Sequence, residues 1–173
     1  MNRTRSFSLI GLAAAAIAAL AVAGCGGGGG TAGASTPKTS TGHAATVGVA
    51  GTGIGNVLVD SQGRTLYLFA KDQGTTSTCS GACATAWPPL RASGKPVAGT
   101  GVTSSLLGTI KRSDGKPQVA YNGHPLYIYV GDQKAGDTNG QGITAFGAGW
   151  FALTASGTQV TATAQGSGGG NGY

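Results

Sequence analysis

Two stretches of the chain each join two runs of strand-forming residues through a polar turn. In the later stretch, residues 118–121 lead into Asn122-Gly123 and then into the apolar run 126–130. Asn-Gly readily adopts the positive φ angles of a tight hairpin turn. In the earlier stretch, residues 56–60 lead through Ser-Gln-Gly into the apolar run 66–70. Both stretches therefore predict a β-hairpin whose returning strand is buried on both faces.

The two hairpins belong to an internal repeat with an offset of 60 residues, and a tryptophan follows in both copies after a further shift of three. This self-similarity predicts two copies of one unit, at about 54–90 and 115–153. The recurring positions are Val59, Gly63, Leu66, Tyr67, Phe69, Asp72, Gln73 and Trp87 in the first copy, and Val119, Gly123, Leu126, Tyr127, Tyr129, Asp132, Gln133 and Trp150 in the second.

The strand pattern predicts an all-β fold, in which two hairpin-based repeats form a small sandwich or barrel-like domain over residues 46–165. A composition with 34 glycines and 9% charged residues also favours strands and turns over helices. Residues 91–103 are predicted to be a loop, with a short turn at 104–107. Residues 159–162 are expected to form a last edge strand.

The N-terminal segment is typical of an exported protein. Arg3 and Arg5 precede an apolar run over 9–22, which is shorter than the ~20 residues that span a membrane. This run ends in Leu-Ala-Val-Ala-Gly-Cys, which resembles a bacterial lipobox with Cys25 as the lipid acceptor. We predict a signal peptide at 1–24, a lipidated flexible spacer at 25–45 and a disordered tail at 166–173. The location predicted is extracytoplasmic, with the lipid in the cell membrane.

The acidic and basic residues narrow the function classes. The chain contains no Glu, which excludes zinc proteases of the H-E-x-x-H type and EF-hand calcium loops. The net charge is +6, but the basic residues are scattered, so they are expected on the solvated surface and no nucleic-acid partner is expected. Beyond the leader these residues are Lys38, Arg64, Lys71, Arg91, Lys95, Lys111, Arg112, Lys116 and Lys134.

Once Cys25 carries lipid, two cysteines remain, Cys79 and Cys83. An even pair outside the cytoplasm predicts a disulfide, and a separation of four residues lets the two sulfurs meet across one turn. The alternative is a redox or copper-handling site, because two thiolates with His124 would suit Cu(I). A disulfide implies no cofactor, whereas the alternative implies copper.

Aromatic residues and a carboxylate recur together in both copies. Tyr67 and Phe69 lie two residues apart on one face of a strand, as do Tyr127 and Tyr129, and an Asp follows each strand. In one interpretation the aromatics fill the core and the Asp accepts N–H groups in a turn. In the other, six residues line a ligand groove: Tyr67, Phe69, Asp72, Tyr127, Tyr129 and Asp132.

These residues give the chain a family resemblance. The segments 67–72 and 127–132 follow the Tyr-x-aromatic-x-x-Asp pattern of the lipoproteins described as a "secreted repeat of unknown function". Two further segments resemble the motifs of this family: Cys-Ser-Gly-Ala-Cys to Trp-Pro-Pro-Leu, at 79–90, and Tyr-Asn-Gly-His-Pro-Leu-Tyr, at 121–127. The resemblance covers about 55–153 and implies a bacterial envelope lipoprotein, without implying a mechanism.

No catalytic constellation can be assembled from the sequence, since His43 lies in the predicted spacer and His124 precedes a proline. We therefore expect a non-enzymatic envelope module. Its partners would be the membrane, through lipid on Cys25, and an envelope protein or polymer.

Overall fold

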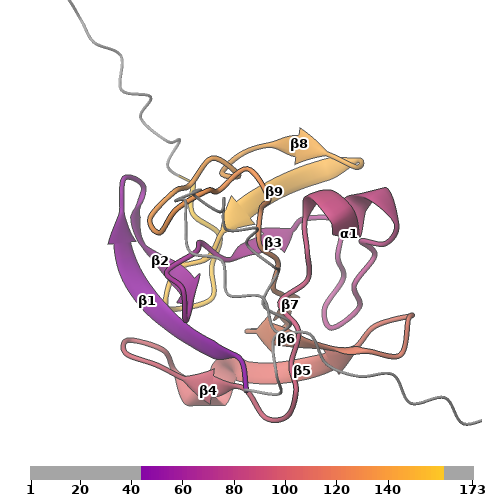
Figure 1. The fold of residues 1–173 in the computed structure, drawn as a ribbon, viewed down its shortest axis with the longest axis horizontal. Coiled ribbons are helices and arrows are strands. Elements are labelled where there is room, and N and C mark those ends of the chain that lie inside the picture. Colours follow the sequence, from indigo (N-terminus) through magenta and orange to yellow (C-terminus); the bar gives the residue numbers. More distant parts are fainter. Residues whose placement is uncertain (1–43, 162–173) are drawn as a thin grey trace, which may run out of the picture. The chain divides into compact units, whose positions relative to one another are not determined.

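A computed structural model describes residues 44–161 of the chain, and their secondary structure is mainly short strands. Three sheets of three strands are formed, with the orders β2-β1-β4, β3-β9-β8 and β5-β6-β7 (Figure 1). The strands are β1 (Thr46–Thr52), β2 (Gly55–Asp60), β3 (Tyr67–Phe69), β4 (Val97–Ala98), β5 (Leu107–Lys111), β6 (Pro117–Tyr121), β7 (His124–Pro125), β8 (Thr144–Ala145) and β9 (Ala148–Ala152). The helical elements are α1 (Ala82–Ala86) and a 3₁₀ turn, η1 (Ser104–Leu106).

Each repeat begins with a strand that the hairpin pattern did not predict. In the first repeat, β1 pairs antiparallel with β2, and Val49 faces Leu58. In the second repeat, β5 pairs antiparallel with β6, and Thr109 faces Val119. The unit that repeats is therefore an outer strand, a hairpin and a segment that ends in a tryptophan.

The two repeats interlock through their returning strands, residues 66–70 and 126–130. Tyr67 and Tyr127 exchange two backbone hydrogen bonds of 2.9 Å across the centre of the domain. The first returning strand then pairs with β9 of the second repeat, with Phe69 opposite Trp150. The second returning strand bonds to residues 86–89 of the first repeat. Each repeat thus supplies a strand partner that the other repeat needs.

The central layer separates two apolar clusters, which explains why the returning strands are apolar on both faces. Leu66 and Leu68 point into an aliphatic cluster that also holds Leu58. Tyr67 and Phe69 point the other way, into a cluster that is rich in aromatic rings. Burial of apolar side chains on both sides, at about 25 cal/mol per Å², makes this layer the centre of the fold.

The predicted all-β architecture with two repeats is confirmed, and equivalent positions of the two returning strands are equally buried, which gives the domain a pseudo-symmetry. Leu66, Leu126, Tyr67 and Tyr127 all have an exposed fraction of 0%. The strands form a sandwich-like arrangement, and the described residues do not form a closed barrel.

The strands before the two turns align differently from the sequence match. Leu66 N–H bonds to Leu58 O, whereas Leu126 N–H bonds to Val119 O. Leu58 and not Val59 is therefore the partner of Val119 in the pseudo-symmetry. The physical reason is that the first turn holds one residue more than the second.

The connections between strands follow the prediction only in part. The turn expected at 104–107 is present as η1, but residues 91–103 include the short strand β4, and α1 was not predicted. At the proposed last edge strand, an isolated bridge joins Gln159 to Leu153.

Several predictions concern residues outside the range that the structure describes. These are the signal peptide at 1–24, lipidation of Cys25, the spacer at 25–45 except its last two residues, and the tail at 166–173. Ala45 is described, and its carbonyl accepts the N–H of Val97, so it already belongs to the β domain. Within residues 44–161 no helix has the length and hydrophobicity needed to cross a membrane.

Candidate functional site

Four aromatic rings form a continuous stack at the centre of the domain. Trp87 and Trp150 lie face to face with ring centroids 4.0 Å apart. Phe69 stacks on the outer side of Trp150 at 4.2 Å, and Tyr129 stacks on the outer side of Trp87 at 4.3 Å. The stack is pseudo-symmetric, because Phe69 corresponds to Tyr129 and Trp150 corresponds to Trp87. It explains the aromatic positions of the repeat as packing across the boundary between the two copies.

The tyrosine and the aspartate that recur in each copy do not bond to each other within a copy, but each bonds to its counterpart's partner in the other copy. Tyr67 donates its hydroxyl proton to Asp132 Oδ2 at 2.7 Å, and Tyr127 donates to Asp72 Oδ2 at 2.6 Å. The other carboxylate oxygens accept turn N–H groups, from Asn139 at 2.9 Å and from Thr78 at 2.7 Å. Each Asp therefore closes its own turn and also fixes the tyrosine of the other repeat.

Burial dominates the electrostatics of these pairs. It raises the pKa of both Tyr67 and Tyr127 far above that of a free phenol, and the adjacent carboxylates raise it further. Burial also raises the pKa of Asp132, although the hydrogen bond from Tyr67 opposes this rise. Both tyrosines are consequently neutral hydrogen-bond donors at any physiological pH.

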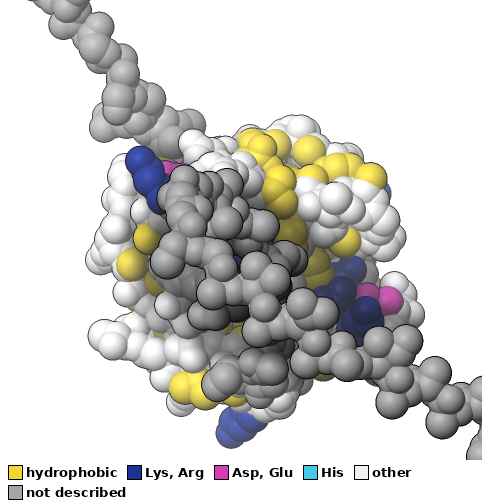
Figure 2. All heavy atoms as spheres, viewed as in Figure 1, with side chains coloured by type: hydrophobic (Ala, Val, Ile, Leu, Met, Phe, Trp, Pro, Cys, Tyr) yellow, Lys and Arg dark blue, Asp and Glu magenta, His cyan; other side chains and the backbone are white. Residues whose placement is uncertain are grey.

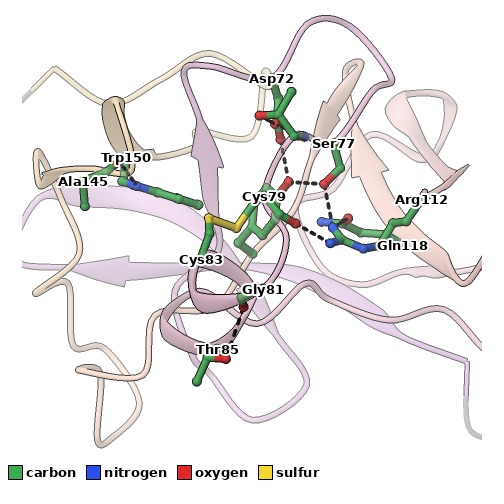
Figure 3. The surroundings of a disulfide bond; sticks show 12 residues. Asp72, Ser77, Cys79, Gly81, Cys83, Thr85, Arg112, Gln118, Ala145 and Trp150 are labelled. Carbon is green, nitrogen blue, oxygen red and sulfur yellow. Dashed lines mark hydrogen bonds between the residues drawn. A yellow bond between two sulfur atoms is a disulfide. The ribbon is translucent and has the colours of Figure 1, made fainter. Parts of the chain in front are cut away.

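A buried arginine extends one of the two pairs into a longer network. Arg112 donates to Ser77 Oγ at 2.6 Å and to Gln118 Oε1 at 2.7 Å, and it also donates to the carbonyl of Cys79 (Figure 3). Ser77 Oγ lies 2.7 Å from the hydroxyl of Tyr127. Because the single hydroxyl hydrogen of Tyr127 is used in the hydrogen bond to Asp72, Ser77 must be the donor in its hydrogen bond with Tyr127. The donors therefore run in one direction, from the guanidinium to the carboxylate.

The position of Arg112 corrects the expectation that the basic residues lie on the solvated surface. Its exposed fraction is 6%. A guanidinium is tolerated there because its neighbours supply several acceptors, and Asp114 adds a carboxylate 3.8 Å from its Nε. The sequence around Arg112 does not indicate that its side chain is buried, since Ser77 and the carbonyl of Cys79, which accept its hydrogen bonds, come from a distant part of the sequence.

Cys79 and Cys83 form the predicted disulfide, at the start of α1 (Figure 3). Both cysteines are buried in the aromatic cluster. The copper alternative requires Cys79 and Cys83 as thiolates with His124 near them. The two sulfurs are bonded to each other, and His124 lies in β7, beside a surface hollow that neither cysteine lines. Residues 44–161 contain no group of three His, Cys, Asp or Glu residues placed to hold a metal ion.

The six residues of the proposed groove are divided between the core and the surface. Tyr67 and Tyr127 are fully buried, so their hydroxyls face partner carboxylates and not solvent. Phe69 and Asp72 line the edge of a surface hollow of about 450 Å³, whereas Tyr129 and Asp132 do not. The hollow is lined by Leu68, Phe69, Ala70, Asp72, Asn122, His124, Gly157, Thr158 and Gln159.

Two segments of the chain, residues 48–91 and 108–154, match the sequence profile of a family described as a "secreted repeat of unknown function". Together they cover more than half of the chain. The chain belongs to this family. Both matched segments start several residues before the repeats predicted from the sequence, because the family repeat includes most of β1 and all but the first residue of β5. Membership of a secreted-repeat family indicates an extracytoplasmic location. No curated protein and no solved structure matches the chain.

Proposed function

We propose that this secreted-repeat protein is a non-enzymatic binding module that lipid on Cys25 holds at the outer side of the cell membrane. In this proposal residues 1–24 are removed on export, the spacer keeps the β domain away from the bilayer, and the domain presents a binding surface to an envelope protein or polymer. The lipobox-like sequence that ends at Cys25 supports the anchor.

The observation that carries the binding role is that the polar groups of the core bind one another. The two tyrosine hydroxyls are buried and engaged with carboxylates, and the two sulfurs are joined. An activated nucleophile has to be free to reach a substrate, and these groups are not. A rigid domain with internal hydrogen bonds and a surface hollow suits recognition better than covalent chemistry.

The buried disulfide supports the location. Disulfides persist in oxidising compartments outside the cytoplasm. In this protein the cross-link lies in the aromatic cluster and next to the Arg112 network, so it is part of the folded core and not an exposed redox pair. It agrees with an exported domain that folds after translocation.

Metabolic labelling tests the anchor. Bacteria that express the protein would be grown with an alkyne-tagged fatty acid, and we expect label on the wild type and none on Cys25→Ser. A matched control moves the thiol without restoring the motif: Cys25→Ser combined with Ser35→Cys should also lack label. Label that persists on Cys25→Ser, or that follows the cysteine to position 35, would show that the proposed anchor is wrong.

A further inference from the structure

The surface hollow lies at a place where the pseudo-symmetry of the two repeats is broken. Its rim includes the turn Asn122-Gly123-His124, whose counterpart in the first repeat is Gln62-Gly63-Arg64. The first turn is covered by the chain: Gly136 N–H bonds to Gly63 O at 3.2 Å, and a β-carbon added at Gly63 would lie 2.9 Å from Ala135 Cβ. By contrast, a β-carbon added at Gly123 would meet no atom within 4 Å, and the second turn is contacted through Asn122, whose Nδ2 donates to Ser156 O and Gly157 O, both at 3.4 Å.

The first repeat contains a segment equivalent to the one that covers the first turn, but this segment does not lie over the second turn. Residues 134–137 cover the first turn, and their counterparts in the first repeat are 74–77. Ser77, at the end of that segment, bonds to Tyr127 and accepts a hydrogen bond from Arg112. Residues 74–77 do not line the hollow, which is bounded by residues 68–70 and 72, by residues 122 and 124, and by residues 157–159. The two turns therefore have different neighbours: residues 134–137 lie over the first, whereas the second borders the hollow together with residues 157–159.

The lining of the hollow indicates the chemistry of a ligand. Residues 68–70 form one wall, in which Ala70 exposes its methyl group while Leu68 and Phe69 are only 4% and 2% exposed, and the rest of the lining carries amide, hydroxyl and imidazole groups. No Lys or Arg lines the hollow, so it has no permanently cationic side chain to pair with an anion. Asp72 already accepts hydrogen bonds from Thr78 and Tyr127, which leaves its carboxylate little capacity for a cation.

Two rim residues carry unused hydrogen-bonding groups. Within residues 44–161, the side chains of His124 and Gln159 make no hydrogen bond, and both lie on the rim of the hollow. An imidazole and an amide each offer a donor and an acceptor, which is what a hydroxyl group needs from its partners. A volume of about 450 Å³ falls within the usual range for small-ligand sites.

We propose that this hollow binds a small, uncharged, hydroxyl-rich molecule, such as one sugar unit of an envelope polymer. The face of the ligand that carries its C–H groups lies against residues 68–70, and its hydroxyls bond to His124 and Gln159. This inference rests on the proposed binding module and names its ligand class.

The test uses the mature chain from position 25 with Cys25→Ser, so that binding is measured without lipid. N-acetylglucosamine and glucose are titrated as hydroxyl-rich probes, with inorganic phosphate and glycine betaine as charged probes, and backbone and imidazole NMR shifts are followed. We expect saturable shifts at Asn122, His124 and Thr158 with a hydroxyl-rich probe, and none at Gln62 or Arg64. The charged probes should give no saturable shift.

Three variants separate binding from folding. Combining His124→Ala with Gln159→Ala should weaken binding about 10-fold through the loss of two hydrogen bonds. The matched control, Gln62→Ala, alters the covered counterpart of Asn122 and should leave binding unchanged. Ala70→Phe fills the hollow, keeps every polar group and should abolish binding while the thermal midpoint stays near that of the parent.

The proposal is overturned if the folded protein shows no saturable shift with either hydroxyl-rich probe, if only phosphate or betaine binds, or if Gln62→Ala weakens binding as much as the double variant. Failure here differs from failure of the anchor. A protein that takes label on Cys25 but binds neither sugar is an anchored module with another partner. A protein that binds sugar but takes no label is a secreted binding module without the lipid.

Discussion

The two repeats differ in the segment that connects the Asp to the Trp, although both segments place the Trp in the same aromatic stack. In the first repeat the connection from Asp72 to Trp87 contains the Cys79–Cys83 disulfide and α1. In the second, the connection from Asp132 to Trp150 has no cysteine and includes β8 and the start of β9, which are joined by a turn with Phe146 at φ 57°. Figure 2 shows hydrophobic side chains at the surface in the region of β8 and β9.

Despite these different connections, both tryptophans reach the same stack. A covalent cross-link holds one connection, and a hairpin with the Trp150 indole N–H bonded to Ala145 O, at 3.3 Å, holds the other. The core shared by the repeats therefore determines where the tryptophans lie, and the connecting segments can differ between the two copies. If this is correct, changes in the stack should affect both repeats equally, whereas changes in the connections should not.

Truncation of either tryptophan should give the largest effect. Trp87→Ala and Trp150→Ala each remove a fully buried indole from the middle of the stack, and each should lower the free energy of unfolding by about 3–5 kcal/mol. Urea denaturation followed by circular dichroism measures both. We expect the two losses to agree within about 1 kcal/mol, given the usual spread for such truncations. A much smaller loss for one of them would show that the repeats do not share the stack equally.

Removal of the cross-link should have a smaller effect, confined to the first repeat. The loop between Cys79 and Cys83 is short, so loss of the disulfide in a Cys79→Ala, Cys83→Ala variant should destabilise the protein by about 2 kcal/mol, towards the lower end of the range for disulfides. Urea denaturation of the variant and its parent gives the difference.

The chemical state of the cysteines checks the same comparison. In freshly isolated protein treated with an alkylating reagent and no reductant, we expect Cys79 and Cys83 to be protected. Free thiols together with stoichiometric Cu(I) binding would instead favour the copper alternative.

The two tyrosine–aspartate pairs should also differ, by a smaller amount. Tyr67→Phe leaves Asp132 buried with one remaining N–H donor, whereas Tyr127→Phe leaves the half-buried Asp72 with two donors from Thr78. We expect a loss of about 1–3 kcal/mol for Tyr67→Phe and a loss near the lower end of that range for Tyr127→Phe. Thermal and urea unfolding of the two variants, compared at the same pH, measures the difference. Equal losses would mean that the burial of the carboxylate does not matter.

The features that sequence analysis predicted are those encoded locally. The hairpins, their turns and the buried Leu66 and Tyr67 follow from residue patterns within about 15 positions, and the repeat follows from comparison of the chain with itself. The outer strand β1 was missed because its glycines, at positions 48 and 51, weaken the alternation of a strand next to a predicted spacer. The helix α1 was missed because five residues are too few for a periodic signal.

The features that sequence analysis missed depend on which copy pairs with which. Two equivalent tyrosines and two equivalent aspartates can pair within a copy or between copies, and nothing in the spacing decides between these arrangements. The same applies to Arg112, whose acceptors include Ser77 and the carbonyl of Cys79, both more than 30 residues away in sequence. The hollow likewise brings together residues 68–72, 122–124 and 157–159, which are far apart in the sequence, although not every residue of these ranges lines it. The recurrence of both Tyr and Asp at the same offset is visible in the sequence, but it is compatible with either pairing.

The smallest predicted difference between the pairs is a pH dependence that comes from Asp132 alone. Burial raises the pKa of this carboxyl in the folded protein above its ordinary value of 3.8. Between the unfolded and the folded pKa, the native state therefore binds more protons than the unfolded state, so the free energy of unfolding decreases as pH rises through this window and is constant above it. Asp132→Asn should remove this part of the pH dependence, and urea unfolding at several pH values from about 3 to 7 measures it against the ordinary titration range of carboxyl groups. Asp72→Asn, the matched change in the other pair, should leave this contribution in place. If Asp132→Asn leaves the decrease unchanged, another carboxyl is responsible and the buried Asp132 is not the group that distinguishes the two pairs.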